Sequence, residues 1–233
     1  GLWHLAFLNT KYLIMESSAT YFSGFSLNDL WFLGEAALRT LWISFLAISI
    51  GSLIGIFLGL ALSVSRIFSF TLGAILDIFR SVPLIIQLVL FFNFAPIIGL
   101  RLNPFEAGLI VLTVYTSAYV ANVARGGIEA VGIPMRQAAR SLGMNYWQDL
   151  RYVVWPIGLR AVFPAWVGVA LGVMKDSALV SILGYVELLK ASQILMTRTQ
   201  EAILILSIAG AFYFALSYPI SYYATRLEQR WSK

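Results

Sequence analysis

The sequence predicts an all-α membrane protein, a polytopic bundle of about five transmembrane helices with one structured cytoplasmic loop. Hydrophobic residues make up 60% of the 233 residues and charged residues only 12%, and the mean hydropathy is +0.82. A soluble domain of this length needs a much larger charged surface. The apolar residues also gather into long runs, and one polar, arginine-rich segment, residues 125–156, interrupts them.

The long apolar runs define the expected transmembrane helices, since a span needs about 20 mostly apolar residues. We expect five spans, at residues 41–64, 82–100, 107–124, 153–174 and 202–224. The first contains Gly51, Gly55 and Gly59, a repeated G-x-x-x-G spacing that predicts close helix packing within the bundle, with an oligomer contact as the alternative. Glu35 and Arg39 are spaced i, i+4 just before it and predict an ion pair near a helix end.

Residues 1–30 precede the spans and mix apolar residues with Lys11 and Glu16. This stretch is too interrupted to predict a span, and it lacks the basic start of a signal peptide. We therefore expect a periplasmic or interfacial lead-in over residues 1–30, followed by one membrane domain over residues 31–233.

The distribution of basic residues predicts the orientation in the membrane. Five spans place the two termini on opposite sides. With the N-terminus outside, ten of the 16 Lys and Arg residues lie on the cytoplasmic side, Arg80 among them. Because Lys and Arg favour cytoplasmic loops, we expect the N-terminus outside and the C-terminus in the cytoplasm, together with residues 125–156.

The polar segment 125–156 has the pattern of two short helices joined by a glycine. Pro134 suits the first turn of a helix, and Gly143 suits the left-handed position that ends one. Asn145 followed three residues later by Gln148 has the spacing of a capping box for the next helix. Two helices joined in this way form a stiff projection, which can convert the movement of a partner into a rearrangement of the bundle.

Three stretches resemble the permease subunits of ABC importers for polar amino acids. They read RSVPLIIQL at 80–88, AYVANVARGGIEAVGIPMRQAARSLG at 118–143, and VVWPIGLRAVFPAWVGVALGVMKDSALVSILGY at 153–185. They follow the order of the family, and the second is similar to its EAA signature, with Gln137, Ala138 and Ala139 followed by Gly143. Together with the five-span layout, the resemblance covers most of the chain beyond the lead-in.

The resemblance implies a translocation subunit in a bacterial inner membrane and not an enzyme. It implies a second permease subunit, a periplasmic amino-acid-binding protein, and two ATPase subunits that hold the ATP and Mg²⁺. It implies no cofactor, metal site, catalytic residue or nucleic-acid partner in this chain. The signature residues would couple the permease to the ATPase: Arg136, Gln137, Ala138, Ala139, Arg140 and Gly143.

The sequence departs from the family pattern at several positions. Gln137 and Asn122 each replace a Glu, Gly168 replaces an Asn, and Lys175-Asp176-Ser177-Ala178 replaces Lys-Asp-Thr-Ser. Such drift in one subunit favours a heterodimer with a different, related permease over a homodimer.

Polar groups at membrane depth predict the substrate route. Lys175 and Asp176 follow the fourth span on the outer side, and such a pair could bind both ends of an amino acid zwitterion. The alternative is mutual neutralisation at a helix end. Ser177, and Tyr119 and Asn122 on the third span, complete the predicted route, although packing within the bundle would explain the last two equally well.

Two other classes of function are alternatives to the importer. A secondary transporter, here of amino acids, couples through intramembrane carboxylates, and the five predicted spans contain no Asp or Glu. A membrane enzyme would need catalytic groups, but the chain has no Cys, and His4 is its only His. The chain also lacks a G-x-x-x-x-G-K-[ST] phosphate-binding loop, so ATP hydrolysis would belong to a partner. Co-purification of an ATPase separates the importer from both alternatives.

Overall fold

The computed structural model describes residues 24–63 and 66–231, and these residues form helices without a strand. The α-helices are α2 (Leu27–Leu62), α3 (Arg66–Ser81), α4 (Leu84–Phe94), α5 (Pro104–Glu129), α6 (Ile133–Ser141), α7 (Tyr146–Asp149), α8 (Trp155–Asp176), α9 (Leu188–Thr199) and α10 (Ala202–Trp231). Two 3₁₀ helices, η1 (Ala95–Ile98) and η3 (Ser177–Leu183), and a π-helical turn, η2 (Leu150–Val154), join them.

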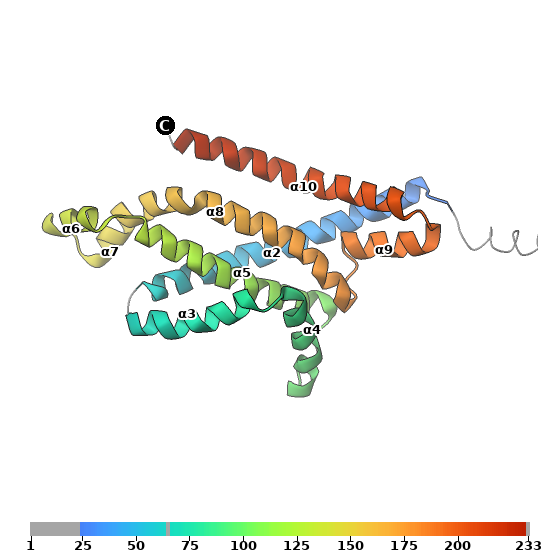
Figure 1. The fold of residues 1–233 in the computed structure, drawn as a ribbon, viewed down its shortest axis with the longest axis horizontal. Coiled ribbons are helices and arrows are strands. Elements are labelled where there is room, and N and C mark those ends of the chain that lie inside the picture. The colour runs from blue at the N-terminus through green and yellow to red at the C-terminus, as the bar shows by residue number, and fades with distance from the viewer. Residues whose placement is uncertain (1–23, 64–65, 232–233) are drawn as a thin grey trace, which may run out of the picture.

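Four continuous helical segments are long and apolar enough to cross a membrane. They are Leu27–Leu62, Pro104–Glu129, Tyr146–Leu183 and Ala202–Trp231, and α3 with α4 adds a fifth if this bent pair counts as one span. Figure 1 shows α2, α5, α8 and α10 running side by side. The predicted helical membrane bundle is therefore confirmed, and the expected spans at 107–124, 153–174 and 202–224 lie within these segments.

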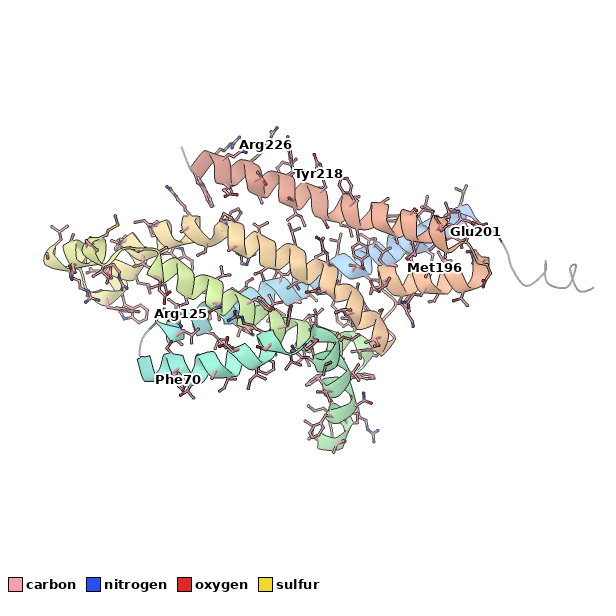
Figure 2. The ribbon with its side chains drawn as sticks, viewed as in Figure 1. Phe70, Arg125, Met196, Glu201, Tyr218 and Arg226 are labelled. Carbon is pink, nitrogen blue, oxygen red and sulfur yellow. The ribbon has the colours of Figure 1, made fainter. Side chains whose placement is uncertain are left out.

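The outer surface of the bundle carries large apolar side chains. Phe70 on α3 and Tyr218 on α10 point away from the bundle in Figure 2, and they are 80% and 53% exposed. A soluble protein rarely leaves so many large apolar side chains uncovered. This surface suits an apolar medium.

The expected span at 82–100 is wrong. Helix α4 has only 11 residues, about 16 Å of helix, which is too short to cross a bilayer. The helix Leu84–Ile98 bends by 99° from α3 at Pro83, which cannot donate a backbone hydrogen bond and disfavours helix in Val82. The Gln87 amide donates to the carbonyls of Phe79 and Val82, at 2.8 and 2.7 Å, and so satisfies the groups freed at this bend.

The placement of Arg80 in a connection between two spans is also wrong. Arg80 and Asp77 belong to α3, which packs against α2 and α5 (Figure 1). Polar residues such as Asp77 and Arg80 interrupt the apolar residues of this stretch, which explains why hydrophobicity alone does not predict a helix here. Arg80 consequently lies beside α5, where the substrate route was expected.

Helix α2 extends further than predicted at its N-terminal end. It begins at Leu27 rather than near residue 41 and runs for 36 residues. The predicted pair of Glu35 and Arg39 is present at 3.9 Å, with both side chains about half exposed. Most of the expected lead-in, residues 1–23, lies outside the described residues, and Leu27–Leu30 belongs to α2.

Three of the four glycines of α2, those of the G-x-x-x-G repeat, face α5 across a very close contact. A Cβ atom built at each position would lie 2.6 Å from a Cβ atom of α5: Gly51 from Thr116, Gly55 from Val120, and Gly59 from Ala124. Only glycine permits this approach. The prediction that the glycines serve packing inside the bundle is confirmed.

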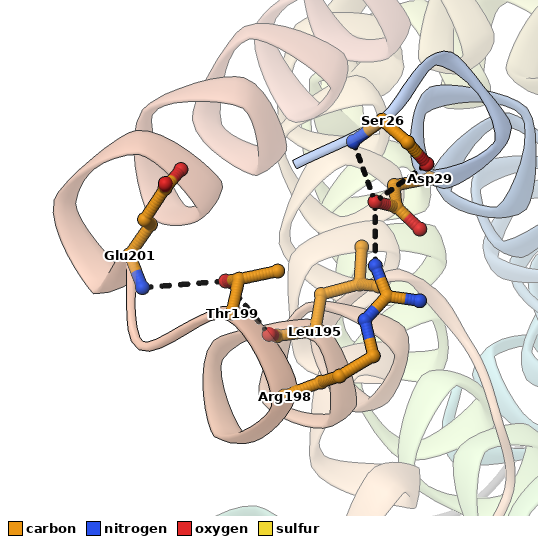
Figure 3. Close-up of polar contacts among 6 residues, drawn as sticks. All are labelled: Ser26, Asp29, Leu195, Arg198, Thr199 and Glu201. Atoms are coloured by element: carbon orange, nitrogen blue, oxygen red, sulfur yellow. Dashed lines mark hydrogen bonds and ion pairs between the residues drawn. The ribbon is translucent and has the colours of Figure 1, made fainter. Parts of the chain in front are cut away.

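The start of α2 is fastened to the end of α9 by a buried carboxylate (Figure 3). Asp29 is 4% exposed, accepts hydrogen bonds from the Ser26 backbone N–H at 2.8 Å and hydroxyl at 3.0 Å, and forms an ion pair with Arg198. One residue on, the Thr199 hydroxyl donates to the Leu195 carbonyl at 2.9 Å and accepts from the Glu201 N–H at 3.2 Å. These contacts fix the turn between α9 and α10.

We expect Arg198→Met to lower the free energy of unfolding by about 1–3 kcal/mol, because Asp29 loses a charged hydrogen bond while it stays buried. The matched control is Arg39→Met, which removes a half-exposed pair and should cost about 0.5 kcal/mol or less. Thermal unfolding of both variants in one detergent measures the difference. Equal melting temperatures would contradict this role of Asp29 and Arg198.

A second buried carboxylate joins three helices at the same end. Glu187 is fully buried and accepts from the backbone N–H groups of Leu189 and Lys190 at 2.9 and 2.8 Å. The hydroxyls of Tyr213 on α10 and Thr40 on α2 lie 3.2 and 3.4 Å from it. Burial raises the pKa of Glu187 above its usual range, and these hydrogen bonds offset only part of that rise. The cluster ties α2, α9 and α10 together.

Candidate functional site

The segment expected to act on a partner projects from one end of the bundle as the pair α6 and α7 (Figure 1). Pro134 lies in the first turn of α6, and Gly143 follows α6 with φ +82°, in the left-handed region. Asn145 and Gln148 form a reciprocal capping box, with both hydrogen bonds at 2.9 Å. These local predictions are confirmed.

The projection carries an exposed apolar surface. Of the predicted docking residues, Gln137, Ala138 and Arg140 are exposed, whereas Ala139 is buried. Five large apolar side chains of the same projection are exposed as well, of which Leu142 is 80% and Trp147 72% exposed: Ile133, Met135, Leu142, Tyr146 and Trp147. We call these five side chains the apolar tip. Such a patch typically marks a surface that another protein covers.

The two arginines of α6 have different surroundings. Arg136 donates from Nε and Nη2 to Oδ2 of Asp149, both at 3.0 Å, and Asp149 is fully buried. Arg140, one turn further on, is exposed. Arg136 is therefore held inside the loop. The sequence did not reveal this pair, because its 13-residue separation depends on how the loop folds.

A π-helical turn connects the projection to α8. The Trp155 N–H bonds to the Leu150 carbonyl, five residues back. The next residue, Pro156, has no N–H to continue an α-helical ladder, which explains the wider turn. Just beyond it, a Cβ on Gly158 would lie 2.6 Å from the Gly127 carbonyl oxygen of α5. The first turn of α8 thus packs closely on the last turn of α5.

A pocket of about 360 Å³ lies between the middle parts of α5 and α8. Its lining residues are Tyr115, Tyr119, Ala165, Gly168, Val169, Gly172, Val173 and Asp176. Gly168 and Gly172 have open space beside them, so a side chain there would occupy the pocket. The Tyr115 and Tyr119 rings lie 4.8 Å apart, and Asp176 neighbours Tyr115. The pocket offers a carboxylate, two hydroxyls and two aromatic faces.

Arg80 adjoins this pocket through Tyr119 and was missed by the sequence analysis. Its guanidinium carbon lies 5.7 Å from the centroid of the Tyr119 ring, and Nη1 lies 2.9 Å from Asp77. With its amide oxygen turned toward Arg80, Asn122 accepts from Nη1 and Nη2 at 2.6 and 3.1 Å. The Arg80 Nε is buried and has no hydrogen-bond partner within the described ranges. A cation therefore stands beside the pocket.

The structure does not bring all the expected pathway residues together in one place. Tyr119 and Asp176 share the pocket between α5 and α8, and Asn122 lies beside it through Arg80. Lys175 lines a different hollow of about 410 Å³, together with Tyr213 and other α10 residues. Lys175 and Asp176 do not meet in one site, since neighbouring helical side chains point about 100° apart.

Ser177 does not line either hollow. It is fully buried, donates to the Met174 carbonyl at 2.8 Å and bonds to the Ser44 hydroxyl at 3.0 Å. Its contacts join the end of α8 to α2. Ser177 thus packs α8 against α2 in this structure, and its part in the substrate route stays a prediction.

A bundle of membrane helices with a pocket that carries polar groups and with a stiff projection is consistent with a membrane transport protein. Residues 51–233 match the family described as "Binding-protein-dependent transport system inner membrane component". The chain belongs to this family. The family description names a transport-system membrane component, which favours the importer over the secondary transporter and the membrane enzyme.

Relatives and a solved structure agree with this assignment. The probable glutamine ABC transporter permease proteins GlnM and GlnP of Bacillus subtilis are 32% and 30% identical, over 76% and 90% of this chain and 84% and 98% of their own lengths. A crystal structure of an amino acid ABC transporter with histidines superposes with a TM-score of 0.78 at 32% identity, covering 85% of this chain and 94% of that one.

Proposed function

We propose that this chain is the permease subunit of an ABC importer that moves a polar amino acid across a bacterial inner membrane. Two separate ATPase subunits would bind ATP and Mg²⁺ and dock on the projection formed by α6 and α7. A periplasmic binding protein would deliver the amino acid to the opposite face. One observation carries the proposal: the exposed apolar tip is continuous, through η2, with the helix that lines the pocket.

The proposed mechanism follows from this continuity. ATP draws the two ATPase subunits together and displaces α6 and α7. Helix α8 moves with them, because η2 joins α7 to α8 without an intervening loop. The pocket between α5 and α8 then opens toward the binding protein. Hydrolysis of ATP returns α8 and opens the pocket toward the cytoplasm.

The pocket chemistry supports an amino acid as the substrate. The Asp176 carboxylate suits the α-ammonium group, and the Arg80 guanidinium, on the other side of Tyr119, suits the α-carboxylate. The Tyr115 and Tyr119 hydroxyls suit a polar side chain. Because both Bacillus relatives are described as probable glutamine permeases, glutamine is the first substrate to test.

A second, related permease is proposed as the partner of this chain in the membrane. The departures from the family pattern support a heterodimer, and so does the presence of two related permeases, GlnM and GlnP, in one organism. We place the N-terminal end of α2 outside and the projection in the cytoplasm. The arrangement in Figure 1 supports this, since α10 runs toward the end where α6 and α7 lie and α2 begins at the other end.

Reconstitution tests the proposed function. The chain is purified from its native membrane with associated subunits, placed in proteoliposomes with the binding protein, and tested with glutamine and a panel of other amino acids. We expect uptake that requires ATP and the binding protein, together with co-purified ATPase and a second permease. Uptake without ATP, or a chain that purifies without an ATPase, would overturn the proposal.

Asp176→Asn should lower glutamine uptake by about tenfold or more, because the α-ammonium group loses a charged partner while the shape of the pocket is kept. Basal ATP hydrolysis should persist, since Asp176 lies far along α8 from the projection. Glu228→Gln, at an exposed position near the end of α10, is the matched control and should leave uptake unchanged. Equal uptake by both variants would remove Asp176 from the proposed site.

A further inference from the structure

We propose that the buried ion pair between Arg136 and Asp149 is the mechanical link that makes α6 and α8 move together. Arg136 is then a positioning residue inside the loop and not a contact with the ATPase. This inference rests on the proposed coupling function and specifies how a displacement of α6 reaches the helix that lines the pocket.

The geometry of the pair shows a contact enclosed by the protein. Both Arg136 donors converge on Oδ2 of Asp149 at 3.0 Å, and the exposed fractions of the two side chains are 23% and 0%. The other oxygen, Oδ1, is buried without a hydrogen-bond partner in the described parts of the chain. Arg136 is thus the only cation paired with Asp149 there. A buried carboxylate that loses its only cation is strongly destabilised, so the pair resists separation.

The position of the pair gives it mechanical importance. Helix α6 packs mainly against α7 and η2 and makes few other contacts. Asp149 is the last residue of α7, and η2 follows it directly and leads into α8. The covalent path from α6 to α7, by contrast, passes through Gly143, whose backbone conformation is not helical. The ion pair bypasses this turn and joins α6 directly to the start of η2.

Arg140 provides an internal comparison. It has the same side chain, lies on the same helix one turn later, and is exposed. It can reach an acidic group on a docked partner, whereas Arg136 is occupied by Asp149. The two arginines of the signature helix therefore have different tasks, one within the loop and one toward the ATPase.

The experiment compares Arg136→Met, Asp149→Asn, Arg140→Met and the exchanged pair Arg136→Asp with Asp149→Arg in the complete transporter. It measures the amount of ATPase retained, the rate of ATP hydrolysis, and the glutamine taken up per ATP. We expect Arg136→Met and Asp149→Asn to keep the ATPase but to lower uptake per ATP by about five- to a hundredfold. The exchanged pair should recover most of this loss. Arg140→Met should instead weaken retention of the ATPase at unchanged uptake per ATP.

Loss of ATPase from Arg136→Met at unchanged uptake per ATP would overturn the inference, because it would make Arg136 a docking residue. An exchanged pair no better than either single variant would overturn it as well. If Arg136→Met does not fold, the Asp149→Asn variant, which keeps the shape of the side chain, decides in its place.

A second readout separates this inference from the proposed function. The chain has no Cys, so Gln137→Cys gives one spin-label site on the exposed face of α6 in the permease without ATPase. Arg136→Met should raise the label mobility, the exchanged pair should restore it, and Arg140→Met should leave it unchanged. This pattern together with uptake that does not require ATP would sustain the link and reject the importer. Unchanged mobility in Arg136→Met would reject the link alone.

Discussion

Gly55→Ala lowers the stability of the bundle by about 1–3 kcal/mol, the cost of adding a methyl group to a fully packed contact. The new Cβ would lie 2.6 Å from the Val120 Cβ and 2.9 Å from the Ser117 carbonyl oxygen. Carbon atoms in contact normally lie about 3.5–4 Å apart. Neither neighbour can swing aside, since one is a Cβ and the other belongs to the backbone, so α2 and α5 must separate.

Thermal unfolding in detergent measures this effect, with Gly34→Ala as the matched control. Gly34 belongs to the same helix, and a Cβ there meets nothing within 4 Å. Alanine in an open helical position favours folding by about 0.5–1 kcal/mol relative to glycine. The two variants should therefore shift the melting temperature in opposite directions. A shift in the same direction for both would contradict the close packing of α2 on α5.

Ala138→Arg should abolish stimulation of the ATPase by substrate and binding protein. Ala138 is exposed on α6 beside the apolar tip, so a large charged side chain there leaves the fold of the permease intact. If α6 docks on the ATPase as proposed, this side chain would have to be buried at the interface between the two proteins. Such a misplaced charge lowers affinity by at least about tenfold. Retention of the ATPase on the purified permease and its stimulated hydrolysis are the two measurements.

The matched control for this variant is Ala202→Arg. Ala202 is also exposed, and it lies at the start of α10, at the end of the bundle away from α6 (Figure 1). We expect this variant to retain the ATPase and its stimulation. If both arginine variants lose the ATPase equally, general damage to the membrane protein explains the loss, and the projection has no special part in docking.

Local signals account for the parts of the fold that the sequence predicted well. The cap at Asn145 and Gln148, the left-handed Gly143, and the ion pair of Glu35 and Arg39 each depend on residues within four positions of one another. The long apolar runs likewise identify their helices by composition alone. These features could be predicted because no distant part of the chain decides them.

Hydrophobicity alone misled the prediction around Pro83. The run at 82–100 is as apolar as a span but too short as a helix, and it bends by 99° from α3. The partly polar helix α3 lies alongside α2 and α5. A window that averages hydropathy cannot register either the bend or the packing of an amphipathic helix. For this reason the sequence does not predict that Arg80 lies beside the candidate site.

The candidate site shows the same division between local and distant information. The sequence predicts that polar residues on α5 and at the end of α8 line the route. It does not predict the directions in which their side chains point. Asp176 and Lys175 diverge into separate hollows, and Ser177 is buried against Ser44. Arg136 pairs with Asp149 across the loop. Which side chains meet is decided by helix rotation and loop closure, and neither can be read from residue spacing.

Cysteine cross-linking tests most directly the claim that α6 is where the ATPase docks. The chain contains no Cys, so Gln137→Cys provides a single reactive site on the exposed face of α6, and Ala202→Cys provides one at the opposite end. With a short thiol-to-amine cross-linker and the assembled, ATP-hydrolysing transporter, we predict a product with the ATPase subunit from position 137 only. An active complex without a product from position 137, or with an equal product from position 202, would contradict the account.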